Sequence, residues 1–413
     1  MSVSTTQGPS KEETMRKSGL NLSGIKDNNR ALLLQLLCTS GQITRSELAS
    51  RSKLSPMTIT NIVNEFLRKN LVEEVPAATH AGLPGRTPMA LQLSCQSPVI
   101  IGLFLSRSTI YAAVGDMSIH PLLQDQLLLE KNETAASILQ KMCVLIEQLL
   151  RRNTRPVLGI GVATIGVVDA DRGKIRYITD FYNIETLDIR DALEQKYDYP
   201  VYVANDMQAA GLCELFFGYG RKADSFLYVG ITNGVGAALV SNRDLLECRS
   251  EMGHMSINCD GPKCTCGNSG CLELYVSTPH LLQNIEEACG TQLPNFQEAV
   301  GFASQNRMAY SILYQVVRRL SVGISNYLNL ISVPLVVLGH DAYYLPDELI
   351  GHLEQSIKKC SVCVHLMDQP IQIVKSTFAD MAPLYGSFCI VLQKYFRGEF
   401  GIEQMPDAAP PEA

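Results

Sequence analysis

The sequence lacks an uninterrupted apolar run long enough to cross a membrane. The longest suspect, Leu320 to Gly339, has 20 residues without a charge, but Ser, Asn and Pro residues interrupt it. A spanning helix needs about 20 predominantly apolar residues, so this stretch predicts a buried helix, a turn and a strand. Residues 1–19 are polar and have no apolar core ahead of a cleavage site. We therefore expect a cytoplasmic protein with no membrane partner.

The sequence also lacks a strong net charge. It has 35 Lys and Arg against 41 Asp and Glu, and a net charge of −6 is too small to identify a partner. The charge is unevenly distributed, because residues 1–94 carry 11 basic and 7 acidic side chains and the remainder carries 24 and 34. This asymmetry predicts nucleic acid contact by the N-terminal part only. The length of 413 residues predicts a small module followed by a larger body.

The N-terminal part predicts three helices. Helical periodicity starts near Ile25. Thr44 and Glu47 have the spacing of a capping box at the start of a short second helix. Ser55 is suited to cap a third helix with Pro56 at its first position, where the missing N–H costs nothing. The third helix has an apolar stripe on one side and short polar side chains on the other.

Two strands, Leu71 to Val75 and Met89 to Leu93, are expected to pair as a wing after the third helix. Residues 20–94 therefore predict a winged helix-turn-helix DNA-binding domain, although a purely structural or protein-binding unit is the alternative. We expect a palindromic, A·T-rich operator. The residues predicted to contact it are Thr58, Thr60 and Asn61 at base edges, Arg45 and Ser55 at phosphates, and Arg86, on a Gly/Pro loop, in a narrow minor groove.

The remainder of the chain, residues 95–400, predicts an α/β body. Strands and helices alternate after Ser94 in two series, which predicts two α/β lobes with a ligand cleft between them. The predicted strands are 100–105, 110–115, 157–162, 201–204, 226–230, 235–240 and 335–338, and the main helices are 137–150, 207–217 and 309–330. Residues 1–19 and 401–413 are polar or rich in Pro and Ala, and we expect them to be disordered tails.

One dense cysteine cluster predicts a metal site. Without a secretion signal, the 13 cysteines are expected to stay reduced, so clustering indicates metal binding. His254 followed by Cys264, Cys266 and Cys271 offers one imidazole and three thiolates, the ligands of a closed tetrahedral zinc site. Four protein ligands leave no open position, so we predict one structural zinc ion per chain that tethers the loop 251–273.

Other cysteine interpretations stay open. Cys259 is a competing ligand for the same ion, and the clustered cysteines could instead be unligated core residues. Cys360 and Cys363, with His365, form a second and sparser group. We interpret that group as part of a half-buried strand rather than as a metal site.

These motifs together resemble the ROK family of repressors, open reading frames and sugar kinases. The resemblance covers nearly the whole chain, and it rests on Ser46–Ala49 through Leu54–Pro56, Gly85–Pro88, Ala204–Ala210, Glu251–His254 and the cysteine segment ending Gly270–Glu273. It implies an actin-like, two-lobed body with a sugar pocket in the cleft. It also implies that the chains assemble into a homodimer or homotetramer. By position, the residues that match the family's sugar contacts are Asn183, Asn205, Asp206, Glu251, His254 and Glu273, with His254 also a zinc ligand.

Carboxylates and amides suit a sugar because ring hydroxyls both donate and accept hydrogen bonds. Taken alone, Asn205 and Asp206 are better explained as a polar helix start after the strand that precedes them, since Asp caps helices well. The presence of Glu251 and Glu273 on the predicted zinc loop favours a pocket instead.

The phosphate-binding parts of the family's kinases are altered. The resemblance makes Asp206 the counterpart of the kinase base, but the first phosphate loop, Phe104 to Ser108, has no carboxylate and no glycine. The second loop reads Thr232 to Ala238, and Gly339-His340 replaces a Gly-Gly pair. Phosphoryl transfer depends on positioning and neutralising phosphate, so these losses predict no enzyme activity.

We expect a regulator, most simply a repressor, that responds to a sugar or sugar phosphate. The alternatives are a sugar kinase fused to a DNA-binding module, or a body that senses a sugar-transport protein.

Overall fold

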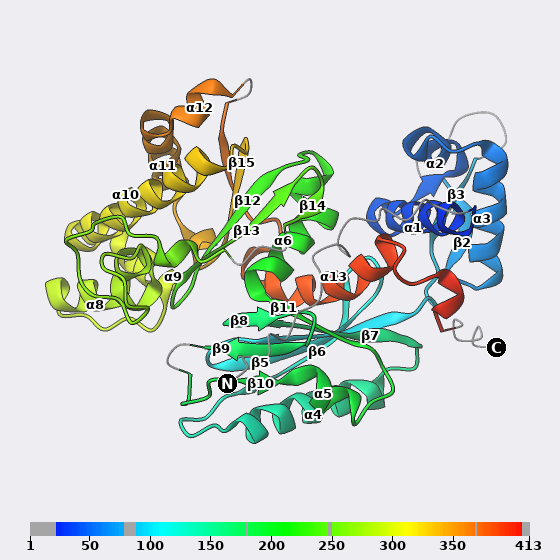
Figure 1. Ribbon diagram of the computed structural model, residues 1–413, viewed down its shortest axis with the longest axis horizontal. Helices are drawn as coiled ribbons and strands as arrows, with labels where there is room; N and C mark the ends of the chain where they lie inside the picture. The colour runs from blue at the N-terminus through cyan, green and yellow to red at the C-terminus, as the bar shows by residue number, and fades with distance from the viewer. Residues whose placement is uncertain (1–21, 78–87, 179–180, 247–249, 368–369, 407–413) are drawn as a thin grey trace, which may run out of the picture.

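The computed structural model describes residues 22–77, 88–178, 181–246, 250–367 and 370–406. It consists of an N-terminal domain of helices and a small sheet, followed by two α/β lobes with two helices at their junction (Figure 1). Across these residues, no helix combines the length and the apolar composition needed to span a bilayer.

The N-terminal domain is a winged helix. It contains α1 (Leu22–Ser40), β1 (Ile43–Thr44), α2 (Arg45–Ser52), α3 (Pro56–Arg68), β2 (Val72–Pro76) and β3 (Met89–Leu93). The capping box of Thr44 and Glu47 is present, and Ser55 caps α3 ahead of Pro56. The strands β2 and β3 pair antiparallel, so the predicted wing is confirmed, and β1 adds to the β3 edge. Leu33, Leu48 and Phe66 lie in the buried core.

The first lobe is built on a five-stranded sheet of order β11-β7-β4-β5-β6. Its strands are β4 (Val99–Leu105), β5 (Thr109–Gly115), β6 (Pro121–Leu128), β7 (Val157–Thr164) and β11 (Val201–Asn205). The helices α4 (Ala135–Arg152) and α5 (Ile189–Glu194) pack against this sheet. A small second sheet contains β8 (Val167–Asp169), β9 (Lys174–Tyr177) and β10 (Leu187–Asp188).

The second lobe has a five-stranded sheet of order β14-β13-β12-β15-β16. Its strands are β12 (Phe226–Ile231), β13 (Val235–Ser241), β14 (Asp244–Leu245), β15 (Leu335–His340) and β16 (Gln372–Lys375). Its helices are α7 (Glu273–Val276), α8 (Thr278–Cys289), α9 (Phe296–Ala303), α10 (Arg307–Leu330), α11 (Asp347–Cys360) and α12 (Val362–Leu366).

Two helices join the lobes, α6 (Asp206–Phe217) and α13 (Ala382–Phe396), and they pack against each other (Figure 1). Helix α13 lies on β4 and β7 of the first lobe, whereas α6 lies on β12 and β13 of the second. Glycines permit the close approach of α13, because a Cβ on Gly102 or Gly115 would lie 2.5 Å from the Phe388 ring. Since α6 starts directly after β11, its first residues face the junction between the lobes.

The structure differs from two sequence predictions. The segment 401–413 does not begin as a disordered tail, because Ile402–Gln404 form a 3₁₀ helix (η6) and Ile402 and Met405 are buried. Their apolar side chains pack in the core cluster that includes residues of the N-terminal domain. The polar composition of the segment gave no indication of this packing. The half-buried strand predicted around Cys360 is also wrong. Ser361 instead caps α12, with its hydroxyl accepting from the Val364 amide, so Cys363 and His365 are helical.

Candidate functional site

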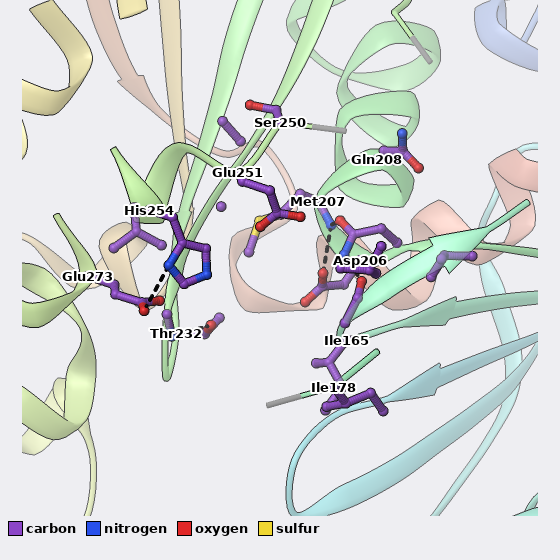
Figure 2. A pocket seen from close by; sticks show the side chains of 18 of the residues that line it. Ile165, Ile178, Asp206, Met207, Gln208, Thr232, Ser250, Glu251, His254 and Glu273 are labelled. Atoms are coloured by element: carbon purple, nitrogen blue, oxygen red, sulfur yellow. Dashed lines mark hydrogen bonds and ion pairs between the residues drawn. The ribbon is translucent and has the colours of Figure 1, made fainter. Parts of the chain in front are cut away.

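A cavity of about 200 Å³ lies between the two lobes (Figure 2). Ile165 and Ile178 line it from the first lobe, and the N-terminal turn of α6 forms another side. The opposite wall comes from the β12–β13 hairpin, the segment from Ser250 to His254, and Glu273. Sites for drug-sized ligands have volumes of roughly 300–1,000 Å³, so this cavity suits a smaller, polar ligand.

Asn205 and Asp206 form the α6 side of the cavity. Asn205 accepts a hydrogen bond from the Met207 amide (2.9 Å) and donates to the carbonyl of Gly166 (3.0 Å). It is therefore the cap of α6, and the helix-start interpretation is correct for this residue while it also lines the cavity. Asp206 is 4% exposed, and its Oδ1 accepts from the same amide (3.0 Å). The carboxylate thus lies at the N-terminus of α6, the positive end of the helix dipole.

Glu251, His254 and Glu273 form the opposite side (Figure 2). Nδ1 of His254, in the 3₁₀ helix η3 (Met252–His254), lies 3.2 Å from Oε1 of Glu273. The hydrogen bond that the His254 imidazole donates to the Glu273 carboxylate raises the pKa of His254 to about 10, while burial acts in the opposite direction. A metal ion on Nδ1 would replace that proton, since a ligating imidazole is neutral.

His254, Cys264, Cys266 and Cys271 form a cluster that can hold a metal ion. Their ligand atoms all lie within 4.8 Å of one another. The Sγ atoms of Cys266 and Cys271 are 3.6 Å apart, and Sγ of Cys264 is 3.7 Å from Nδ1 of His254. Ligand bonds of about 2.0–2.3 Å in a tetrahedron fit these spacings. Three thiols and one imidazole are a donor set that fits zinc.

The loop geometry brings the cysteines together. Gly267 (φ 93°) and Gly270 (φ 64°) adopt positive φ, and a Cβ on Gly270 would lie 1.7 Å from the Asn258 carbonyl oxygen. A hydrogen bond from the Asn268 backbone lowers the pKa of Cys266, whereas burial raises that of Cys271 to about 12. Cys259 is exposed and lies outside the cluster.

The structure brings together all but one of the residues predicted for the pocket. Asn183 lies away from it, beside a separate cavity at the start of α4. Positive φ at both Tyr182 (49°) and Asn183 (55°) turns the chain at this point. Neither the residue type nor its position in the sequence revealed that turn.

The predicted DNA contacts that the structure describes lie on α2, on α3 and at the cap of α3. Asn61 is exposed, Thr58 and Thr60 are partly exposed, and Ser55 is exposed at the start of α3. The Thr60 hydroxyl donates to the Pro56 carbonyl (2.9 Å). Arg45 forms an ion pair with Glu74 of β2, with 2.7 Å between Nη2 and Oε1. Arg86 lies outside the described residues.

Sequence reasoning missed several residues that line the pocket. Arg107 and Thr232 come from the two altered phosphate loops, which were interpreted only as a loss of phosphate binding and not as part of a pocket. Gln208 was passed over although it is two residues beyond Asp206, and Ser250 although it precedes Glu251. The apolar residue Ile178 carries no signal that separates a pocket wall from a core.

The family model described as "ROK family" matches residues 100–394, and a model described as "MarR family" matches residues 28–76. The chain belongs to the ROK family. Among its relatives, the xylose repressor of Bacillus subtilis (strain 168) is 26% identical over 90% of this chain and 96% of its own length. The N-acetylglucosamine repressor of Escherichia coli O157:H7 is 24% identical over 92% of this chain and 95% of its own length.

Solved structures share the fold. A ROK family transcriptional regulator, described as a homologue of the Escherichia coli MLC protein, superposes with a TM-score of 0.76 at 24% identity, covering 91% of this chain and 97% of its own. A ROK hexokinase from Thermus thermophilus gives 0.60 at 24% identity, covering 71% and 97%. The hexokinase match covers a smaller share of this ROK chain than the regulator match does. The fold is therefore a winged helix joined to an actin-like sugar-kinase body.

Proposed function

We propose that this protein is a DNA-binding transcriptional regulator, a repressor of carbohydrate uptake or catabolism genes, whose DNA affinity is set by a sugar or sugar phosphate. One observation carries the proposal: a winged helix with an exposed polar helix face is joined, in one ROK chain, to a small cavity lined by carboxylates. The relatives named xylose repressor and N-acetylglucosamine repressor support it over almost the full length of the chain.

The DNA-binding role assigns α3 to the major groove. Thr58, Thr60 and Asn61 contact base edges, Ser55 and Arg45 contact phosphates, and Arg86 enters an A·T-rich minor groove. Arg45 must leave Glu74 to do so, which is a small cost because both side chains are partly exposed. A homodimer or homotetramer presents two such helices to a palindrome.

The sugar-binding role assigns the polar side chains of the cavity to the ring hydroxyls. Asp206 and Asn205 act from α6, and Glu251, His254 and Glu273 act from the other side. Asn183 remains a candidate only if lobe movement carries its turn to the cavity. We assign one structural zinc ion per chain to His254, Cys264, Cys266 and Cys271, which would fix the wall that carries Glu251 and Glu273.

A packed route connects the pocket with the DNA-binding helix. Asp206 begins α6, which packs on α13, and α13 leads to η6. Glu403 of η6 pairs with Arg30, which also binds Glu65 on α3. We propose that lobe closure around the sugar moves α13 and so changes the angle of the winged helix. The sugar can then change the DNA affinity by no more than the ratio of its own affinities for the two arrangements.

The kinase alternative finds less support. Asp206 keeps the position of a base, but the loop from Phe104 to Ser108 offers no carboxylate for metal and no glycine for close phosphate approach. Relatives named as repressors match 90%, 89% and 92% of this chain. The remaining alternative, a body that senses a sugar-transport protein, predicts binding of that protein with no effect of free sugars.

Calorimetric titration of the full-length protein with D-xylose, D-glucose, N-acetylglucosamine and their phosphates tests the sugar role. We expect binding by at least one of them and no thermal shift with ATP and magnesium. Asp206→Asn and Glu251→Ala should weaken binding, while Glu298→Ala, an exposed carboxylate on α9, is the control. Sugar-dependent ADP release at about 1–100 per second would instead identify a kinase.

A further inference from the structure

His340, at the end of β15, has a backbone conformation that non-glycine residues rarely adopt. Its φ is 51° and its ψ is −137°, far from the left-handed helical region that Asn and Asp occasionally enter. Such strained positions persist only where the surrounding structure holds them, and they occur mostly at functional sites. Strain alone identifies no role, so the side chain is the next observation.

The His340 imidazole is buried, with 6% of the residue exposed. Its Nδ1 lies 3.2 Å from the Tyr228 hydroxyl. Among the residues that the structure describes, its Nε2 has no hydrogen-bond partner, although it lies 3.6 Å from Oδ2 of Asp206. A buried polar atom without a partner is rare in folded proteins. Here the unpartnered atom faces the carboxylate that forms one side of the cavity.

The space for this arrangement is built by neighbouring glycines. A Cβ on Gly230 would lie 2.6 Å from Nδ1 of His340, and a Cβ on Gly339 would lie 1.8 Å from the Tyr228 hydroxyl oxygen. Tyr228 is itself fully buried, and burial raises its pKa well above the ordinary value. The hydroxyl therefore keeps its proton and can donate it to Nδ1.

One tautomer of the neutral His340 imidazole satisfies both contacts. If Nδ1 accepts from Tyr228, the proton of a neutral imidazole is on Nε2, directed at Asp206. Asp206 Oδ1 already accepts from the Met207 amide, so a bond from Nε2 to Oδ2 would fix the carboxylate plane. The gap of 3.6 Å is slightly longer than such a bond, so a small movement of α6 would complete it.

We propose that His340 is a positioning residue for the effector site: its Nε2–H orients the Asp206 carboxylate toward the sugar hydroxyls. The contact joins β15 of the second lobe to the first residue of α6, and binding of the sugar completes it. This inference rests on the proposed function, because it concerns the sugar-facing side of Asp206.

Three substitutions separate this role from simple packing. His340→Gln keeps a donor at the position of Nε2, His340→Asn keeps only a group near Nδ1, and His340→Gly removes both while suiting the backbone. Because a hydrogen bond to a charged group corresponds to about tenfold or more in affinity, the Asn and Gly variants should raise the sugar Kd about 10-fold or more. The Gln variant should remain close to the wild type. DNA binding without sugar should be unchanged in all three.

Unchanged sugar affinity in the Asn and Gly variants would overturn the proposal. Equal loss in all three variants, with a lowered melting temperature, would also overturn it, because a packing role predicts that pattern. If the wild type binds none of the tested sugars, the proposed function fails separately. In that case the contact between His340 and Asp206 is tested by long-range ¹H–¹⁵N NMR of the imidazole. The signals of the His340 ring are identified by their absence from the spectrum of His340→Gln. A proton on Nε2 that responds to Asp206→Asn supports the contact, and a proton on Nδ1 overturns it.

Discussion

Arg30 of α1 and Glu403 of η6 form an ion pair, with 2.7 Å between Nη1 and Oε1. The same guanidinium binds Glu65 of α3 through Nη2 (2.5 Å) and Asp27 through Nη1 (3.0 Å). Arg30 is 6% exposed, so three carboxylates surround a buried cation. One side chain thus connects the predicted DNA-reading helix with the segment that follows α13.

Glu403→Gln tests this connection. Because the Glu403 side chain is 58% exposed, the free energy of unfolding should fall by less than about 1 kcal/mol. The sugar-induced change in DNA affinity should nevertheless become smaller, as measured by fluorescence anisotropy. The control is Glu399→Gln, which breaks the nearby pair with Lys394 and leaves Arg30 untouched. Equal sugar responses in both variants would refute the route through η6.

Cys264→Ser should remove the metal. Structural zinc stabilises a small site by about 10 kcal/mol, so loss of one ligand should unfold the loop and lower sugar affinity while the winged helix stays folded. Elemental analysis should find one zinc ion per chain in the wild type and in Cys259→Ser, whose thiol lies outside the cluster. Metal-free wild-type protein that still responds to sugar would show the assignment to be wrong.

Asn61→Ala should relax base preference at one symmetric pair of operator positions, by about 1–3 kcal/mol. Arg45→Ala should instead weaken binding to all sequences alike and flatten the salt dependence. Glu74→Gln frees Arg45 from its pair and should strengthen binding to all sequences slightly. Competition titrations with single-base operator variants distinguish these patterns. Uniform weakening by Asn61→Ala would remove that residue from the base-reading set.

Phe388→Ala should destabilise the body by about 3–5 kcal/mol, because the ring fills the space above Gly102 and Gly115. Phe388→Leu should cost less, since more of that volume stays filled. Urea denaturation monitored by circular dichroism measures both changes. A free energy of unfolding that the Ala variant leaves unaltered would contradict the packing of α13 on the first lobe.

Local signals in the sequence predicted much of the fold. Capping at Thr44 and Ser55 depends on residues three positions apart, and the wing pairing and the metal cluster join residues no more than 21 positions apart. Long-range packing carried no such signal: the polar segment after Phe400 docks through Ile402, and Asn183 turns away from the pocket. The Asp206 and His340 contact joins residues far apart in the chain, and no pattern in the sequence predicted it.

The most direct test of the account is the anisotropy titration of full-length protein with a palindromic DNA obtained by in vitro selection, with and without D-xylose, D-glucose, N-acetylglucosamine or their phosphates. The account predicts specific binding with two recognition helices on half-sites about one or two helical turns apart, and at least tenfold weaker binding with one of these sugars. If no palindrome is selected, or if every sugar leaves the affinity unchanged, the account of a sugar-controlled repressor is contradicted.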